Sequence, residues 1–267
     1  HEYADATKKD NPGFVKIAGD YRVQARTEGA RNVGIDAKEK YSRDAEVLEK
    51  ALIDEPENAR YQFYLAQSYF DSQQWEKSLE AYRKRVEMGG WNEEVFYSQF
   101  RVGLISGIMK EPHEVIIKEF MDAYNIRPIR AEPLVEISRI YRMNDKPAAA
   151  FPFARLAAEI PYPEQDILFI SEDIYRFGAL DELGAVAYYA GRPEEGYLAC
   201  KKLMEGDRVA PEHIDRVRTN LQQYEQVMAQ VQAQKMQIDM QSQVDKLKKR
   251  REEKALQQKT TYKKKKA

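Results

Sequence analysis

The chain has 267 residues, of which 43% are hydrophobic and 33% are charged, and its formal net charge is −1 at pH 7. This composition is too apolar for a globally disordered protein, and no apolar run approaches the roughly 20 residues that span a bilayer. The single cysteine, Cys200, excludes an internal disulfide and favours a reducing compartment, so we expect a cytoplasmic protein without a transmembrane segment.

Residues 1–40 do not have a helical pattern. Glycines and a proline interrupt this stretch, and two short β-like runs occur at 14–18 and 21–25. We expect an irregular lead-in that is either the end of a preceding domain or a segment that packs against the first helix.

Residues 41–225 have the apolar periodicity of helices, and turn signals separate them at fairly regular intervals. Each signal contains glycine, proline, asparagine or aspartate, which favour turns and stop helices. The predicted turns are DEPEN at 54–58, MGGW at 88–91, RPIR at 127–130, NDKP at 144–147 and AGRP at 190–193.

The stretch 61–90 resembles a tetratricopeptide repeat, a helix-turn-helix unit of about 34 residues. Its Leu65, Ala66, Tyr69 and Tyr82 occupy the places that interlock the two helices, whereas Ser78 stands where alanine is usual. The pattern returns irregularly, and the segment Ile160–Ile174 interrupts it as a connector with its own short helix. The fold class implied is an all-α, tetratricopeptide-like solenoid over residues 41–225. Later repeat positions are taken by Ile137, Tyr141, Ala150, Ala157, Leu183, Gly184, Gly191 and Gly196.

From Pro211 onward the chain contains no glycine and no further proline, which predicts a long helix. Its first part carries an apolar stripe that should close the end of the solenoid: Ile214, Val217, Leu221, Tyr224 and Met228. Residues 226–267 are expected to form a projecting helix that frays into a basic, disordered tail.

The net charge hides an asymmetry between the tail and the rest of the chain. Residues 246–267 contain 11 lysines and arginines against 2 glutamates, a net +9, and the remainder carries −10. One interpretation is a solvated tail, and the other is an arm that binds nucleic acid or an anionic surface. The basic residues concerned include Lys248, Lys249, Arg250, Arg251, Lys263, Lys264, Lys265 and Lys266.

The sequence offers little for catalysis. The three histidines are far apart, Cys200 has no sequence-level activating partner, and no phosphate-binding glycine loop occurs. His113 and His213 lie at predicted helix starts, where a surface role is expected. The paired carboxylates lie at turns and helix starts, where they favour the helix dipole. We therefore expect no catalytic residue and no cofactor in this chain.

The GGW turn, the IPYP connector and the DELG and AYYAG segments lie outside the generic repeat pattern. They resemble the helical region that follows the catalytic domain in bacterial and viral family 2 glycosyltransferases, and the resemblance covers residues 1 to about 225. The opening His1, Glu2 and Tyr3 are similar to the tripeptide that ends such catalytic domains.

The resemblance implies that a divalent metal and a nucleotide sugar belong to a preceding α/β domain with a DxD motif. This chain contains no DxD, so by itself it is not expected to transfer sugar. By the same resemblance, His1 is a metal ligand only if such a domain precedes it.

Two functions follow from these patterns: an accessory region of a glycosyltransferase that positions the catalytic domain or another partner, or a free-standing scaffold that binds a protein or peptide. A weaker alternative is nucleic-acid or anionic-surface binding by the tail. The partner-binding groove of such repeats is lined by the first helix of each unit. The alternative role of its aromatic residues is packing against the adjoining repeat, and that of its charged residues is simple solvation. The predicted groove residues are Arg60, Phe63, Gln67, Phe70, Glu132, Val135, Arg139, Arg142, Asp181 and Tyr188.

Overall fold

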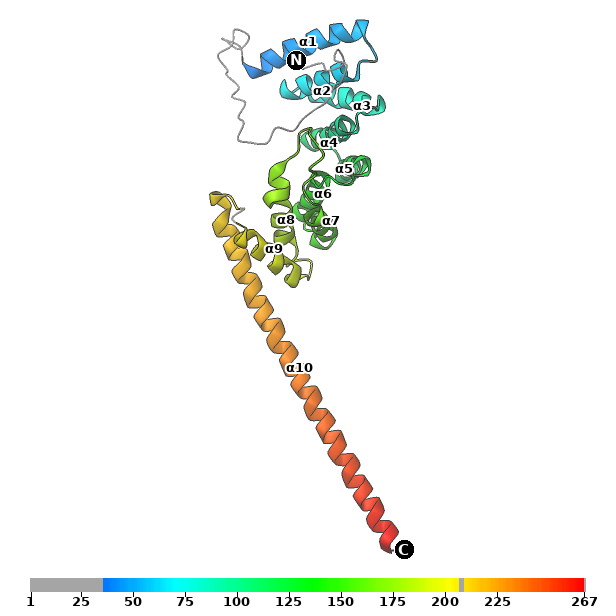
Figure 1. Cartoon of the computed structure of the whole chain (residues 1–267), viewed down its shortest axis with the longest axis vertical. Coiled ribbons are helices and arrows are strands. Elements are labelled where there is room, and N and C mark those ends of the chain that lie inside the picture. Colours follow the sequence, from blue (N-terminus) through cyan, green and yellow to red (C-terminus); the bar gives the residue numbers. More distant parts are fainter. Residues whose placement is uncertain (1–35, 207–208, 267) are drawn as a thin grey trace. The chain divides into compact units, whose positions relative to one another are not determined.

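A computed structural model describes residues 36–206 and 209–266, and every regular element in these ranges is helical (Figure 1). The predicted all-α class is therefore confirmed. Most of the expected lead-in, including its β-like runs and His1, lies outside the described residues. The last residues of the lead-in, from Ala37 to Lys40, instead form the start of the first helix. Asp36 caps this helix by accepting a 2.9 Å hydrogen bond from the Glu39 amide.

The described residues form two compact units. The first unit contains residues 36–140 and the connector Ile160–Ser171; the second contains Tyr141–Glu159 and the residues from Glu172 onward. The helices of the first unit are α1 (Ala37–Asp54), α2 (Ala59–Asp71), α3 (Trp75–Glu87), α4 (Asn92–Ile108), α5 (His113–Ile126) and most of α6 (Glu132–Met143).

Helices α2 and α3 form the predicted helix-turn-helix unit, and its key positions are in the core. Ala66 and Tyr82 are fully buried, and Tyr69 is almost so. The Ser78 hydroxyl donates a 2.9 Å hydrogen bond to the Ala66 carbonyl, which explains how serine replaces alanine between the helices without leaving a buried hydroxyl unpaired. The repeat assignment made from these residues is confirmed.

The MGGW turn between α3 and α4 depends on glycine. Gly89 and Gly90 have φ values of +64° and +87°, which other residues rarely adopt. The buried Arg85 donates a 2.7 Å hydrogen bond to the Gly89 carbonyl. The other four predicted turns also lie between consecutive helices.

The connector differs from the expectation in one respect. Residues 160–171 contain no helix, and the short helix expected inside the connector instead follows it, as the π-helical turn η1 (Ile174–Gly178). Ion pairs and hydrogen bonds, described below, hold the connector against the first unit.

The second unit consists of the end of α6, α7 (Pro147–Glu159), η1, α8 (Ala179–Val186), α9 (Pro193–Glu205) and α10 (Pro211–Lys266). Val186, Ala187 and Leu203 are fully buried in its core. Val217 of α10 joins them, as the predicted stripe requires. The first part of α10 thus packs in the core of the second unit, and its closing of the solenoid's end stays a prediction.

The expected disordered tail is not what the structure describes, because α10 is continuous to Lys266 (Figure 1). From Ala229 to Arg251 every side chain is exposed, although Ala229, Val231 and Lys235 still border α9 at a shallow pocket. Glutamine, lysine, methionine and alanine are good helix formers, and no helix breaker follows Pro211, so local propensity favours the helix over this exposed stretch. None of the described helices combines the length and hydrophobicity needed to cross a membrane.

Candidate interaction surfaces

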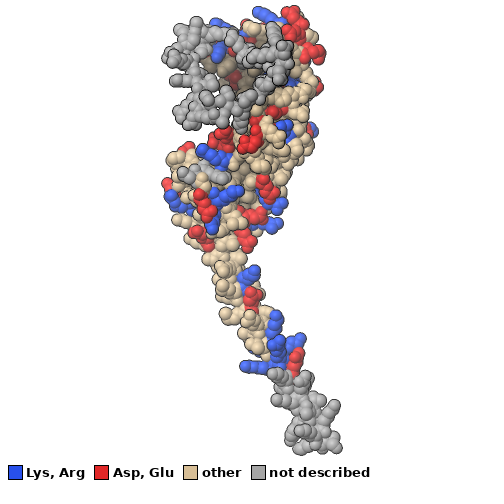
Figure 2. All heavy atoms as spheres, viewed as in Figure 1, with Lys and Arg blue, Asp and Glu red and all other residues tan. Residues whose placement is uncertain are grey.

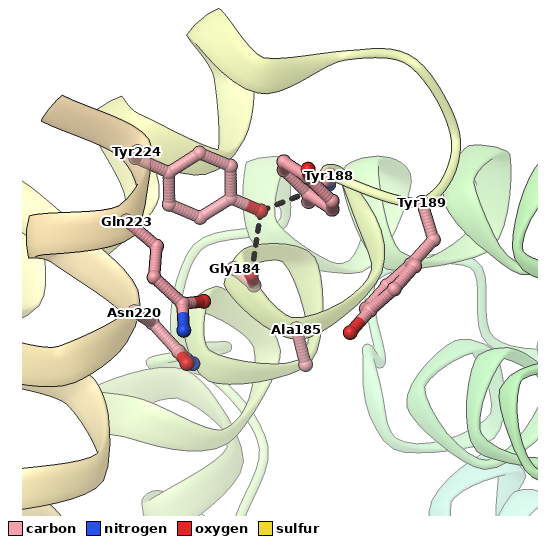
Figure 3. A pocket seen from close by; sticks show the side chains of 7 residues that line it. All are labelled: Gly184, Ala185, Tyr188, Tyr189, Asn220, Gln223 and Tyr224. Carbon is pink, nitrogen blue, oxygen red and sulfur yellow. Dashed lines mark hydrogen bonds between the residues drawn. The ribbon is translucent and has the colours of Figure 1, made fainter. Parts of the chain in front are cut away.

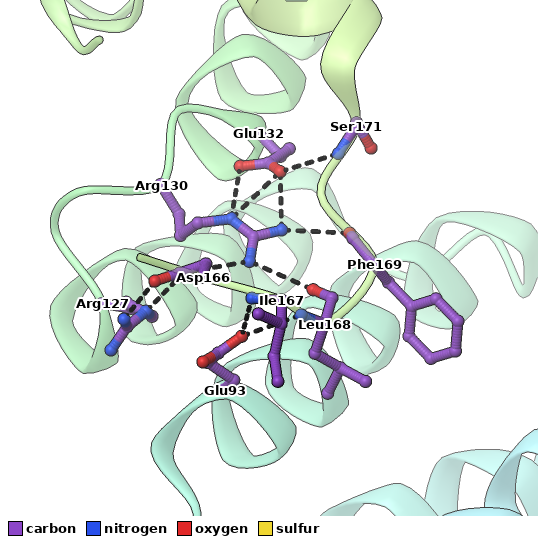
Figure 4. A network of polar contacts seen from close by, with 9 residues as sticks. All are labelled: Glu93, Arg127, Arg130, Glu132, Asp166, Ile167, Leu168, Phe169 and Ser171. Carbon is purple, nitrogen blue, oxygen red and sulfur yellow. Dashed lines mark hydrogen bonds and ion pairs between the residues drawn. The ribbon is translucent and has the colours of Figure 1, made fainter. Parts of the chain in front are cut away.

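A buried arginine, Arg130, fixes the connector to the first unit (Figure 4). It is the last residue of the RPIR turn, and its Nε contacts both oxygens of Glu132 at 3.1 Å. Its Nη1 lies 3.3 Å from Asp166, and Nη2 donates to the Phe169 carbonyl at 3.1 Å. The guanidinium also lies over the Phe96 ring, 4.6 Å from its centroid. A single side chain therefore ties α6 and α4 to the connector.

Asp166 and Glu93 complete this network. Asp166 accepts a 2.6 Å hydrogen bond from Arg127 Nε. Burial raises the pKa of Asp166, but the hydrogen bonds and charges of Arg127 and Arg130 outweigh that effect and hold it below its usual range. Glu93, at the start of α4, accepts 2.8 Å hydrogen bonds from the Ile167 and Leu168 amides. Three segments of the sequence thus meet in one network. They are the NEE that follows the GGW turn, the segment RPIRAEP, and the segment IPYPEQDILFI.

The network holds Phe169 in an exposed position. Its φ is +45°, which is strained for a phenylalanine, and 47% of its surface is exposed. Its ring packs against Tyr97 of α4 at 4.7 Å and stacks on Phe63 of α2 at 6.4 Å. We call Phe63, Phe70, Tyr97 and Phe169 the aromatic row.

Arg101 of α4 lies against the aromatic row. Its guanidinium is 3.4 Å from the Phe70 ring centroid and 5.5 Å from that of Tyr97. Its Nε and the hydroxyl of the fully buried Tyr82 have no hydrogen-bond partner among the described residues. The charge of Arg101 acts on Asp71, whose pKa is raised by burial and partly lowered by this cation, but no ion pair joins the two in the described part of the chain.

The predicted groove residues differ in accessibility within the first unit. Phe63, Glu132 and Val135 are buried: Phe63 packs in the core and Glu132 pairs with Arg130. Their side chains therefore position neighbours and are not surface available to a partner. The half-exposed members are Arg60, Gln67, Phe70 and Arg139. Arg60 pairs with Glu94, and its guanidinium lies 5.2 Å from the centroid of the Trp91 ring. Arg139 pairs with Glu136.

Tyr97, Arg101 and Phe169 were missed by the sequence prediction. Tyr97 and Arg101 lie one repeat period of about 34 residues after Phe63 and Gln67, so extending the groove assignment to α4 would have found them. Phe169 carried no such signal, because it belongs to the connector and not to a repeat helix.

The predicted residues of the second unit are held by ion pairs. Arg142 forms a two-pronged pair with the buried Glu182 at 2.9 and 3.0 Å, which raises the pKa of Arg142. Asp181 forms a similar pair with Arg216 of α10, both contacts being 2.9 Å. Both residues therefore stabilise this unit.

Tyr188 lies at a pocket between the end of α8 and α10 (Figure 3). The Tyr224 hydroxyl donates to the Gly184 carbonyl at 2.8 Å and accepts from the Tyr188 amide at 2.9 Å. Burial raises the pKa of Tyr224 to about 12. This satisfied, buried tyrosine gives the pocket a fixed wall.

The histidines and the cysteine form no reactive cluster in the described part of the chain. His213 stacks on Phe177 at 5.4 Å, His113 begins α5, and burial raises the pKa of the Cys200 thiol to about 11. Among the described residues, no three histidine, cysteine, aspartate or glutamate side chains are grouped as a metal site.

The basic residues of α10 lie beyond its packed part. Side chains from Lys246 to Arg251 are exposed, and Figure 2 shows basic side chains gathered toward the end of the described surface of α10. Lys263 to Lys266 are also predicted to belong to the basic tail, but their side chains lie outside those that the structure describes.

No family model matches the chain, and no curated protein matches it. Among solved structures, a crystal structure of MamA shares 16% identity over 66% of this chain and 96% of that chain, with a TM-score of 0.47. A second MamA structure covers 62% and 82%, with the same identity and TM-score. TTC0263, a thermophilic TPR protein in Thermus thermophilus, shares 16% identity over 69% and 90%, with a TM-score of 0.41. The tetratricopeptide-like arrangement itself is carried by the helix pairs and core contacts described above.

Proposed function

We propose that this chain is a non-catalytic interaction domain whose first unit binds an acidic segment of a protein partner at Arg101 and the accessible rings of the aromatic row, Phe70, Tyr97 and Phe169. The observation that carries the proposal is the Arg101 guanidinium, held against Phe70 and Tyr97 without an ion pair to any described residue. An arginine that is fixed before binding loses little conformational entropy when it pairs.

The chemistry of Arg101 suits a carboxylate. A guanidinium presents a planar set of donors that matches the two oxygens of an aspartate, a glutamate or a chain terminus. The half-exposed rings of Phe70, Tyr97 and Phe169 add apolar contact area beside this charge. Aromatic residues and arginine are also the types most enriched at the energetic centres of protein interfaces.

Asp71 makes this surface selective. Its charge opposes an incoming carboxylate, so only a ligand whose anion approaches Arg101 away from Asp71 gains the full attraction. Replacing Asp71 by asparagine should therefore strengthen the binding of an acidic peptide. A ligand that instead used Asp71 as a hydrogen-bond acceptor would be weakened by the same change.

We infer further that the domain is an accessory region of a glycosyltransferase and positions its catalytic domain or another component. The proposal is supported by the sequence resemblance, because its segments GGWNEE, RPIRAEP and IPYPEQDILFI contribute Glu93, Arg130 and Asp166 to one buried network. The divalent metal and nucleotide sugar would belong to a catalytic domain preceding His1. A reading frame that continues upstream into an α/β domain with a DxD motif supports this role; one that begins within a few residues of His1 favours a free-standing scaffold.

The peptide-binding part is tested by selection from a random peptide library displayed on phage, with the full chain as bait. We expect the selected peptides to share an aspartate or glutamate beside an apolar residue. Synthetic copies should bind Arg101→Ala at least about tenfold more weakly, because a charged hydrogen-bonded contact is lost. Arg43→Ala is the matched control, since Arg43 is an exposed arginine of α1 whose ion pair, among the described residues, lies within its own helix. Selected peptides without acidic residues, or unchanged binding to Arg101→Ala, would contradict the proposal.

A further inference from the structure

The pocket between α8 and α10 in the second unit has a composition of its own. It is lined by Gly184, Ala185, Tyr188, Tyr189, Asn220, Gln223 and Tyr224, with no charged residue among them (Figure 3). The pocket is shallow and partly open, and its empty space is about 310 Å³ only when the part that opens to solvent is counted. The missing charge disfavours an anion, a metal ion or an ionised peptide side chain as its ligand.

Two tyrosine rings form one side of this pocket. Tyr189 is 73% exposed and Tyr188 is 49% exposed, although aromatic rings are usually more buried. Their centroids are 5.3 Å apart and their planes are nearly perpendicular, at 86°. They therefore offer a ring face and a ring edge to a ligand with apolar C–H groups.

Two carboxamides form the opposite side. Asn220 and Gln223 lie one helical turn apart on α10, and neither amide is engaged by any described part of the chain. Each carboxamide carries both donors and an acceptor. The ligand that satisfies both functions must itself donate and accept hydrogen bonds.

We propose that this pocket binds one neutral sugar ring. The C–H face of a pyranose packs on a tyrosine ring, and its hydroxyls, which both donate and accept, pair with Asn220 and Gln223. A proline-rich peptide would also pack on the tyrosines. However, proline has no N–H, so it would leave the carboxamide oxygens without donors. This site is independent of the proposed protein-binding function, since it lies in the other unit and uses other residues.

The pocket has a rigid support. The Tyr224 hydroxyl joins Gly184 and the Tyr188 amide, which fixes the turn that carries both exposed tyrosines. A prearranged site loses less free energy on binding than a mobile one. Because a methyl glycoside is small, we expect a dissociation constant of about 1 mM.

The test uses saturation-transfer difference NMR on the full chain with methyl glycosides of glucose, galactose, mannose and N-acetylglucosamine. At least one should give signals, strongest for the ring C–H protons. Tyr189→Ala should weaken this binding about tenfold, whereas Tyr189→Phe should retain it because the ring remains. Asn220→Ala and Gln223→Ala should each reduce it. Tyr197→Ala, a tyrosine of α9 outside this pocket, is the matched control.

Three outcomes would overturn the inference. One is the absence of a signal from all four glycosides with a folded chain, as judged by circular dichroism. Another is equal binding to Tyr189→Ala and the unchanged protein. The third is binding of pentaproline with no response to the glycosides, which would assign the pocket to a proline-rich peptide. Loss of acidic-peptide binding would not affect these results, so the two proposals fail separately.

Discussion

Arg130 and Glu132 form a buried ion pair in which the Arg130 Nη2 lies 2.7 Å from Oε1 of Glu132. Both side chains are almost completely buried, and Asp166 is the second carboxylate that contacts the same guanidinium. Removing the arginine would leave two buried anions without this partner. The pair therefore sets the stability of the first unit and the position of the connector.

We expect Arg130→Met to lower the free energy of unfolding by about 3–5 kcal/mol, the cost of breaking a buried ion pair by removing one partner. Urea denaturation followed by circular dichroism measures it. Arg155→Ala is the control, because Arg155 is exposed and pairs weakly with Glu159 on the same helix. Its effect should stay within about 0.5 kcal/mol. Equal, small effects of both changes would contradict the structural role of Arg130.

The acid dependence of stability should report Asp166. Its pKa in the folded protein lies below the unfolded value of about 3.9, so its stabilising contribution is complete above that value. The contribution is lost as the pH falls from about 4 through the folded-state pKa. Unfolding free energies measured between about pH 7 and pH 3 should therefore fall more steeply for the unchanged protein than for Asp166→Asn. Parallel curves would mean that Asp166 is not held ionised by its arginines.

Gly196 illustrates a glycine required for packing. A Cβ at this position of α9 would lie 2.2 Å from Tyr224, so Gly196→Ala should destabilise the protein by about 1–3 kcal/mol despite the better helix propensity of alanine. Gly107 is the matched control, since no atom lies within 4 Å of its added Cβ. Gly107→Ala should be neutral or stabilise by up to about 1 kcal/mol. Thermal unfolding compares the two, and the opposite order would contradict the contact with Tyr224.

The Cys200 thiol should be unreactive in the folded protein. It is buried with a pKa of about 11, so about one thiol in a thousand is ionised at pH 8. Reaction with a chromogenic disulfide reagent should be slow in buffer and release one equivalent promptly in denaturant. Prompt reaction of the folded protein would show that Cys200 is accessible.

The helix pairs could be predicted from sequence because local signals specify them. Ala66, Tyr69 and Tyr82 mark the interlocked helices, and Gly89 and Gly90 mark a turn that other residues would strain. The same signals do not distinguish a groove residue from a core residue on a first helix. Phe63 and Val135 were therefore assigned to the groove although both are buried.

The connector network could not be predicted in this way. Arg130 and Asp166 are far apart in the sequence, and nothing in either local pattern marks them as partners. Phe169 is placed by these long-range contacts and not by periodicity. Tyr189, next to the predicted Tyr188, gained its role only once α10 was placed beside α8.

The most direct test of the proposed partner binding is a double-mutant cycle between Arg101 and the acidic residue of a selected peptide. Binding is measured by isothermal titration calorimetry for the protein and Arg101→Ala, each with the acidic peptide and its alanine variant. The proposal predicts a coupling free energy of about 0.5–3 kcal/mol, because each single change removes the same contact. Additive effects, agreeing within about 0.3 kcal/mol, would contradict a direct contact between Arg101 and the partner's carboxylate.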